Sequence, residues 1–299
     1  MRRLGRLALT IALVVVAVYV AISWRYADDL TRVFRDPLKR TPAYVAPVHE
    51  DVTFRSRDGL LLKGWWFPAT RADRAVVMVH GKDQNRIDSS FDPGRIAHFL
   101  LADGWSVLVF EMRGHGESEG LRWGLGEHEP NDILSAIDLA AAKAQIDRRR
   151  VATIGESMGA GSVLMTVGRD PSIGPIVVDS AYESARTVID EVGPDYSHLP
   201  AFFTPGMVLM GRLFFDIDIG GIVPIDVVRT HPERAFLFIQ CENDRTVAAH
   251  HGIDLRSASA NARSELWLVK ECGHVLAFAT HPDEWREHVL AFLHREIGN

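Results

Sequence analysis

The chain has 299 residues, of which 47% are hydrophobic and 24% are charged, and its mean hydropathy is +0.00. These average values exclude a disordered chain, a collagen-like repeat and a membrane protein with several spans. The formal net charge is −6. Because residues 1–24 contain Arg2, Arg3 and Arg6 and no acidic residue, residues 25–299 carry a charge of −9, which excludes the basic surface expected of a nucleic-acid-binding protein.

An uncharged apolar segment follows these arginines. Residues 7–24 read LALTIALVVVAVYVAISW, and a helix of that length spans about 27 Å, close to the hydrocarbon thickness of a bilayer. Basic residues before such a run are typical of a secretory signal or a signal-anchor. Cleavage after Ala21-Ile22-Ser23 would release a secreted protein, but the run is longer than a usual signal core. We therefore expect residues 1–24 to be a retained, single-pass transmembrane anchor.

Charge alone does not decide the orientation of this anchor. Basic residues also follow the span, at Arg25, Arg32, Arg35, Lys39 and Arg40, so the positive-inside rule gives no clear answer. The short basic head is typical of an export signal. We therefore expect the C-terminal domain to lie outside the cytoplasm.

The rest of the chain divides into a tether and one domain. Residues 25–48 contain three prolines, show no sustained periodicity and are predicted to be the tether. From residue 49 to residue 299, short apolar runs alternate with amphipathic stretches, the pattern of an α/β domain with a mostly parallel sheet and helices on both faces. The predicted strands are Val52–Arg55, Leu60–Phe67, Ala75–Val79, Ser106–Phe110, Val151–Ile154, Ile176–Val178, Ala235–Gln240 and Glu265–Val269. The predicted helices are Ile87–Asp103, Glu127–Gln145, Ser157–Val167, Thr246–Ala260 and Pro282–Ile297.

One segment of this domain interrupts the alternation. Residues 185–228 are rich in Phe, Met, Pro and Gly, and we expect an inserted lid there. Its large apolar residues suggest contact with an acyl or alkyl group of a substrate, although packing against the sheet would explain them equally well. The candidate substrate-binding residues are Phe202, Phe203, Met207 and Phe214.

A nucleophile motif lies between a predicted strand and a predicted helix. The sequence Gly155-Glu156-Ser157-Met158-Gly159 has the form G-x-S-x-G, which places a serine on a sharp strand-to-helix turn. Glycines beside the serine relieve the clashes that such a turn creates. Ser157 is therefore the predicted nucleophile.

A serine hydroxyl needs a base, and the base needs an acid to orient it. His274 follows the strand ELWLV and is the best candidate base. Asp244, after the strand AFLFIQ, is the preferred acid, and Asp179 and Glu242 are weaker alternatives. All these side chains fall at the carboxyl ends of predicted strands, where open α/β sheets place their sites.

The oxyanion of an acyl-transfer reaction requires backbone donors. The N–H of Met158, directly after the nucleophile, is one candidate. The loop His80-Gly81-Lys82 supplies the other, and we assign it to the N–H of Lys82, whose side chain we expect to be solvated. The histidines show no zinc-binding spacing such as H-E-x-x-H, so no metal is expected.

Together these motifs resemble the α/β-hydrolase superfamily over residues 50–299. The resemblance rests on His80-Gly81, the segment EMRGHGES at residues 111–118, residues 155–159, Asp244 and Gly273-His274, in that order. The anchor, the segment VVDSAYES and the short lid are similar to the Bem46-like, ABHD13-like group. The resemblance implies a serine hydrolase without metal or cofactor, acting on an ester or thioester as a carboxylesterase, lipase or thioesterase does.

Two other functions stay open at this point. An acyltransferase would use the same three residues, and a non-catalytic membrane-tethered binding protein would keep only the fold. The partners expected are a small-molecule or lipid-like ester and the membrane. Finally, Cys241 and Cys272 end neighbouring predicted strands; a disulfide is conceivable in an oxidising compartment, but we favour two buried thiols.

Overall fold

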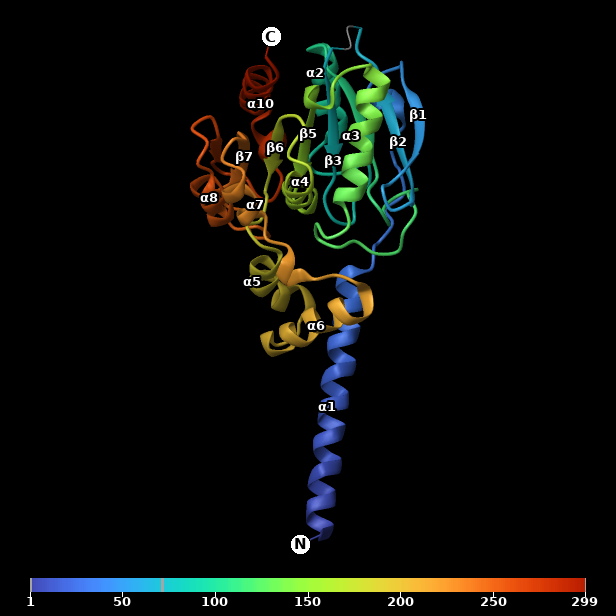
Figure 1. The fold of residues 1–299 in the computed structure, drawn as a ribbon, viewed down its shortest axis with the longest axis vertical. Coiled ribbons are helices and arrows are strands. Elements are labelled where there is room, and N and C mark those ends of the chain that lie inside the picture. The colour runs from blue at the N-terminus through green and yellow to red at the C-terminus, as the bar shows by residue number, and fades with distance from the viewer. Residues whose placement is uncertain (1, 71–72, 299) are drawn as a thin grey trace.

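The computed structural model describes residues 2–70 and 73–298, and its central feature is an eight-stranded sheet (Figure 1). The strand order is β1-β2-β4-β3-β5-β6-β7-β8. Strand β2 runs antiparallel to β1 and β4, whereas β4, β3, β5, β6, β7 and β8 are parallel. The bounds are β1 (Glu50–Arg55), β2 (Leu61–Phe67), β3 (Ala75–Val79), β4 (Ser106–Phe110), β5 (Val151–Glu156), β6 (Ile176–Asp179), β7 (Phe236–Cys241) and β8 (Glu265–Val269). The predicted α/β fold, with eight mostly parallel strands, is therefore confirmed.

Helices cover both faces of this sheet because its central strands are apolar on both sides. In β3, for example, Val77 faces one buried cluster and Val76 faces the other. Helices α3 (Pro130–Ala144), α4 (Met158–Arg169) and α8 (Ala249–Ala258) contribute to the first cluster. Helices α2 (Pro93–Ala102), α9 (Ala277–Thr280) and α10 (Pro282–Ile297) contribute to the second.

The helix predicted from Ile87 begins six residues later, at Pro93. The amide of the Asn85 side chain explains the difference, because its Oδ1 accepts hydrogen bonds from the N–H groups of Ile87 and Asp88 and holds them in a turn. Asp92 then caps the helix by accepting from the N–H of Arg95.

Helix α1 (Arg2–Thr31) projects from the domain and extends beyond the predicted anchor (Figure 1). It is long and apolar enough to cross a membrane. Its last turns are part of the domain, because Tyr26, Ala27, Asp28 and Thr31 are buried. An isolated sequence pattern that ends at Trp24 does not reveal these tertiary contacts.

The segment after α1, predicted to be a tether, is also bound to the domain. The N–H of Phe34 donates to Oδ1 of Asp83 at 3.0 Å. The guanidinium of Arg35 donates to the carbonyl oxygens of Gly116, Ser118 and Gly120. Residues 32–36 therefore join α1 to the loops after β3 and β4.

The segment predicted to be a lid folds into three helices and two 3-10 turns: α5 (Ala185–Ser197), η3 (Ala201–Phe203), α6 (Thr204–Phe215), η4 (Ile219–Gly221) and α7 (Pro224–Thr230). Helices α5 and α6 lie at the base of the sheet domain, next to α1 (Figure 1). All three helices join the first apolar cluster, α5 through Val188, α6 through Met207 and α7 through Val228. Whether the segment acts as a lid stays a prediction.

Candidate active site

Ser157 lies on a sharp turn between β5 and α4. Its φ of 51° and ψ of −120° place it in a backbone region that side chains disfavour. Both glycines of the motif are required by close packing. A Cβ on Gly155 would lie 2.8 Å from the carbonyl oxygen of Gly159, and a Cβ on Gly159 would lie 2.5 Å from that of Val79. The predicted elbow is thus present, with Ser157 at its apex.

The structure brings Ser157, His274 and Asp244 together through two hydrogen bonds. Oγ of Ser157 lies 2.8 Å from Nε2 of His274, and Nδ1 of His274 lies 2.8 Å from Oδ2 of Asp244. Because a carboxylate only accepts, Nδ1 carries the proton and Nε2 is left to accept from the hydroxyl. This tautomer is the one that a general base for Ser157 needs.

The carboxylate of Asp244 is fully buried but well supplied with donors. Its Oδ1 accepts from the N–H groups of Thr246 and Val247 at 2.8 and 2.9 Å. The side-chain amide of Gln240 donates to Oδ2 at 3.4 Å. These bonds fix the carboxylate so that Oδ2 faces the imidazole.

The two alternative acids occupy other environments. Asp179 accepts hydrogen bonds from the Ser180 hydroxyl at 3.1 Å and from Nε1 of Trp285 at 3.4 Å. Burial raises the pKa of Asp179 to about 7, which disfavours the charged form. Glu242 is exposed to solvent. The hydrogen bond to His274 is made by Asp244 instead.

Of the two predicted oxyanion donors, Met158 adjoins the nucleophile in the chain, and Lys82 follows Gly81, which packs against it. Met158 is the first residue of α4, directly after Ser157. Gly81 contacts Ser157 closely, because a Cβ on Gly81 would lie 3.4 Å from Cβ of Ser157. In the described part of the chain, the N–H groups of Lys82 and Met158 donate to no other residue, so both remain available to a ligand.

The side chain of Lys82 is paired, contrary to our expectation of a solvated side chain. Its Nζ hydrogen-bonds to Asp83 and, at 3.0 Å, to the hydroxyl of Tyr196. It also lies over the rings of Trp123 and Tyr196, at 5.3 and 5.1 Å from their centroids. Burial lowers the pKa of Lys82, but the bonds to Asp83 and Tyr196 outweigh it and the net direction is upward. The ammonium is therefore held charged.

Two buried histidines support this loop and do not act on Ser157. His80 donates through Nδ1 to the carbonyl of Gly81 and accepts through Nε2 from the N–H of Met112. Burial lowers the pKa of His80 to about 3, so its ring is neutral. His115 accepts from the N–H of Asp83 at 3.2 Å, and burial lowers its pKa to about 4.

Two buried arginine–carboxylate pairs shape the EMRGHGES loop and were not identified from the sequence. Arg86 forms a bidentate pair with Glu111 at 2.9 and 2.8 Å. Arg113 bonds to the buried Asp132 at 3.1 and 2.7 Å and also reaches Asp58. Arg86 and Asp132 lie in unremarkable sequence, so no local pattern marks them.

Cys241 and Cys272 form a disulfide, so our preference for two buried thiols is wrong. Cys241 is the last residue of β7 and Cys272 follows β8, the neighbouring strand, so the two Cα atoms lie 5.2 Å apart, within the range that a disulfide needs. The N–H of Asn243 also donates to the carbonyl of Cys272 at 3.2 Å. The disulfide thereby joins the loops that carry Asp244 and His274.

His250 and His251, two neighbouring histidines of α8, both pair with an acidic residue of α5. Ligand atoms of Glu183, His250 and His251 lie within 4.8 Å of one another. However, both rings already pair with Glu191, at 3.2 and 3.1 Å, and His251 also accepts from the N–H of Glu183 at 3.4 Å. These bonds account for both rings as links between α5 and α8.

The four candidate substrate-binding residues do not form one group. Phe203 and Met207 are buried, whereas Phe202 and Phe214 are exposed. Phe202 and Phe203 stack on Tyr19 of α1, with centroids 6.2 and 5.2 Å away. Their role in substrate binding stays a prediction.

Comparisons with known proteins show to which family and fold this chain is similar. The family model described as "Serine aminopeptidase, S33" matches residues 70–214. An uncharacterized Salmonella typhi protein, YfhR, is 29% identical over 250 residues, which cover 77% of each chain. The thiohydrolase apmlB of Arthrinium phaeospermum is 32% identical over 130 residues, 43% of this chain and 41% of that one. The Pyrococcus furiosus esterase Pf2001 superposes with a TM-score of 0.74 at 22% identity, over 89% of this chain and 100% of the esterase.

The strand order and the nucleophile turn agree with one architecture. The match within residues 70–214 includes β3, the EMRGHGES loop and the nucleophile turn. The likeness to the esterase extends over 89% of this chain. The chain therefore has the α/β-hydrolase fold, and the family model and the esterase structure support its place in the α/β-hydrolase superfamily.

Proposed function

We propose that the protein is a membrane-anchored serine hydrolase that cleaves a carboxylic ester or thioester. The observation that carries the proposal is the pair of 2.8 Å hydrogen bonds that connect Ser157, His274 and Asp244. The likeness to an esterase and to a thiohydrolase supports both bond types. In this proposal Ser157 is the nucleophile, His274 the base and Asp244 the orienting acid.

The reaction follows from the positions of these groups. Nε2 of His274 takes the hydroxyl proton as Oγ of Ser157 attacks the carbonyl carbon. The N–H groups of Met158 and Lys82 stabilise the resulting oxyanion. The His274 imidazolium then gives its proton to the departing alcohol or thiol, which leaves an acyl-enzyme. Water, activated by His274, releases the carboxylic acid and restores Ser157.

Retention of α1 as an anchor is supported by its packing. The hydroxyl of Tyr19 donates to the carbonyl of Phe202 at 2.9 Å, and the ring of Trp24 lies 6.2 Å from that of Phe215. These contacts connect the apolar part of α1 to α6. A secretory signal that is removed would not need specific contacts with the mature domain. We therefore infer that α1 remains attached and that the protein lies at a membrane.

The disulfide supports an extracytoplasmic domain, because disulfides persist in oxidising compartments. A cysteine-reactive reagent that cannot cross membranes, applied to intact cells carrying an Asp29→Cys variant, tests this orientation. Labelling without permeabilisation is expected; labelling only after permeabilisation would place the domain in the cytoplasm.

The proposed activity is tested with the Ser157→Ala protein in detergent. Hydrolysis of p-nitrophenyl butyrate is expected to fall about a million-fold, as in other enzymes with such a triad. The matched control is Ser162→Ala, one turn further along α4, where the hydroxyl donates to the carbonyl of Met158 at 2.8 Å. Unchanged turnover by Ser157→Ala would refute the proposal. A loss shared equally by Ser162→Ala would indicate damage to α4.

A further inference from the structure

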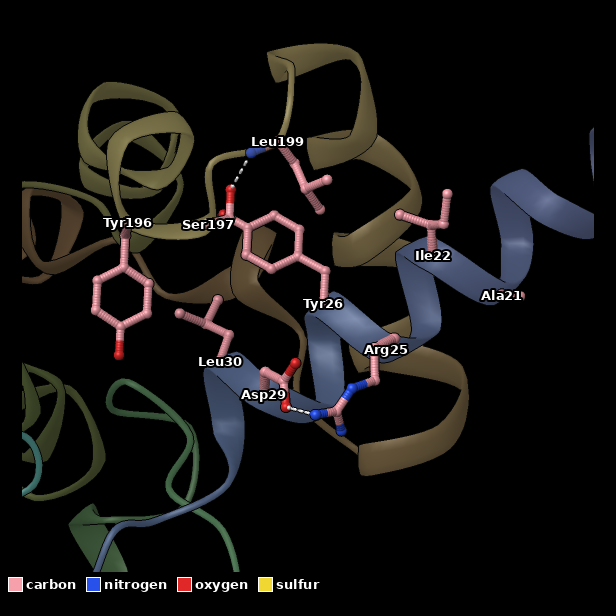
Figure 2. A pocket seen from close by; sticks show the side chains of 9 residues that line it. All are labelled: Ala21, Ile22, Arg25, Tyr26, Asp29, Leu30, Tyr196, Ser197 and Leu199. Carbon is pink, nitrogen blue, oxygen red and sulfur yellow. Dashed lines mark hydrogen bonds and ion pairs between the residues drawn. The ribbon is translucent and has the colours of Figure 1, made fainter.

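A pocket of about 520 Å³ lies between α1 and the end of α5. One wall consists of α1 residues from Ala21 to Leu30, and the other consists of Tyr196, Ser197 and Leu199 (Figure 2). The pocket contains both apolar side chains, such as Ile22 and Leu199, and charged ones. The walls of an ordinary core cavity, in contrast, are apolar throughout.

The pocket lies across the boundary between the apolar and charged parts of α1. Ala21 and Ile22 belong to the uncharged run that ends at Trp24. Arg25 and Asp29 lie beyond it and pair with each other at 2.8 Å (Figure 2). If α1 spans a membrane, one end of the pocket faces the hydrocarbon and the other faces the headgroups.

The surface of helix α6 independently indicates where the membrane boundary lies along α1. Large apolar side chains at its surface and at the preceding turn are each more than half exposed: Phe202, Leu209, Leu213 and Phe214. Gly206 allows α6 to approach α1 closely, because a Cβ there would lie 2.8 Å from the hydroxyl of Tyr19. The exposed apolar surface of α6 is thereby held beside the end of the apolar run, where a bilayer would cover it.

A short chain of contacts connects the pocket to the nucleophile. Tyr196, which lines the pocket, accepts a hydrogen bond from Nζ of Lys82 at 3.0 Å. Lys82 follows Gly81, which packs against Ser157. The Tyr196–Lys82 contact therefore links one wall of the pocket to the loop that holds the proposed oxyanion donor.

The geometry points to this pocket as the binding site for a long-chain acyl ester that resides in the bilayer. The acyl chain would enter from the hydrocarbon beside Ile22, and the polar part would lie between Arg25 and Asp29 on one wall and Tyr196, the partner of Lys82, on the other. This inference rests on the proposed hydrolase activity of Ser157 and names the substrate class of that site. An amphiphile fits because the pocket joins an apolar end to a charged end.

The test compares two esters with one full-length protein reconstituted in vesicles of ether-linked phosphatidylcholine. One ester, p-nitrophenyl butyrate, is water-soluble, and the other, p-nitrophenyl palmitate, is incorporated in the bilayer. The substitutions Ile22→Trp and Leu199→Trp fill the pocket. Each is expected to lower the palmitate-to-butyrate rate ratio about tenfold or more, because the chain loses its binding space. The matched control, Ile11→Trp, lies on the exposed surface of α1 outside the pocket and is expected to change neither rate.

Equal loss of both rates, or an unchanged ratio, in the pocket variants would overturn the inference. So would a wild-type protein that cleaves butyrate but not palmitate, although the proposed hydrolase activity would stand. A second measurement does not depend on turnover. In the Ser157→Ala protein, a diazirine-bearing alkyl ether lipid is expected to crosslink to residues 196–199, and Leu199→Trp is expected to reduce this. Crosslinks to α1 without any to residues 196–199 would contradict the inference even if the hydrolase activity were lost.

Discussion

The carboxyl edge of the sheet and the base of the molecule use different kinds of interaction. At the edge, Ser157, His274 and Asp244 come from three separate loops and meet through two hydrogen bonds of 2.8 Å. At the base, α1 and α6 meet mainly through aromatic and apolar side chains, and several large apolar residues remain exposed. Hydrogen bonds are directional, so those at the edge fix the relative positions of the reacting groups. Apolar contacts are non-directional, so those at the base indicate only that the surroundings are apolar. From the edge we infer the type of reaction, and from the base we infer that the substrate comes from the bilayer.

The largest expected effect on activity identifies which carboxylate at the carboxyl edge orients His274. Asp244→Asn is expected to lower kcat/KM about 10⁴-fold, because His274 would lose the acceptor that fixes its tautomer. Asp179→Asn is the matched control, since Asp179 ends the neighbouring strand and bonds to Ser180 and Trp285 instead. Its loss is expected to be much smaller. Steady-state kinetics with p-nitrophenyl butyrate measure both, and a greater loss in Asp179→Asn would reverse the assignment of the acid.

Reducing the disulfide measures how much this covalent link at the carboxyl edge contributes to the stability of the fold. Reduction of Cys241–Cys272 is expected to lower the free energy of unfolding by about 2–4 kcal/mol, the usual range for a native disulfide. Urea unfolding with and without dithiothreitol measures the difference. The double variant Cys241→Ser/Cys272→Ser is the control and should not respond to the reductant. A wild-type midpoint that dithiothreitol leaves unchanged would contradict this role.

At the base, a buried ion pair connects α1 to the domain. Asp28 is almost fully buried and accepts from Arg122 at 2.5 Å. Arg122→Ala is expected to lower the free energy of unfolding by about 1–3 kcal/mol, because Asp28 would lose its main partner and retain Arg32 at 3.0 Å. Arg149→Ala removes an exposed pair with Asp147 and is expected to change nothing measurable. Thermal unfolding in detergent compares the two, and equal midpoints would mean that α1 is held by its apolar contacts alone.

The smallest expected effect concerns pH. Burial raises the pKa of Glu156 to about 8, above its ordinary value near 4.5. The folded state therefore binds a proton that the unfolded state releases, so this contribution is complete below about pH 4.5 and is lost as pH rises through about 8. Glu156→Gln is expected to make the decline of the unfolding midpoint between pH 5 and pH 9 shallower. Glu242→Gln, at an exposed carboxylate, serves as the control, and identical pH profiles for Glu156→Gln and the wild type would contradict the prediction.

Local patterns were sufficient to predict much of the fold and the candidate site. All eight strands were predicted near their observed positions, and the central strands β3 to β7 were the plainest because strands covered on both faces are continuous apolar runs. Ser157 was found because the elbow is a local strand–turn–helix sequence. Asp244 and His274 followed from their places after strands, since parallel strands end at one edge.

Contacts between distant segments were not predictable in the same way. Tyr196 meets Lys82 across 114 residues, and neither residue has a sequence neighbour that indicates the other. The burial of Tyr26 and Asp28 depends on α5 and on Arg122, which close around α1 only in the folded chain. The prediction for the two cysteines was wrong because strand adjacency alone does not give the distance between the last residue of β7 and a residue in the loop after β8.

The central claim is that His274 activates Ser157, and covalent labelling tests it most directly. The full-length protein is incubated with a fluorophosphonate, and intact mass and peptide mapping locate the adduct. One adduct per chain on Ser157 is predicted, with none in Ser157→Ala and much slower labelling in His274→Ala. A folded protein that takes up no label, or labels at another residue in both wild type and Ser157→Ala, would contradict the account.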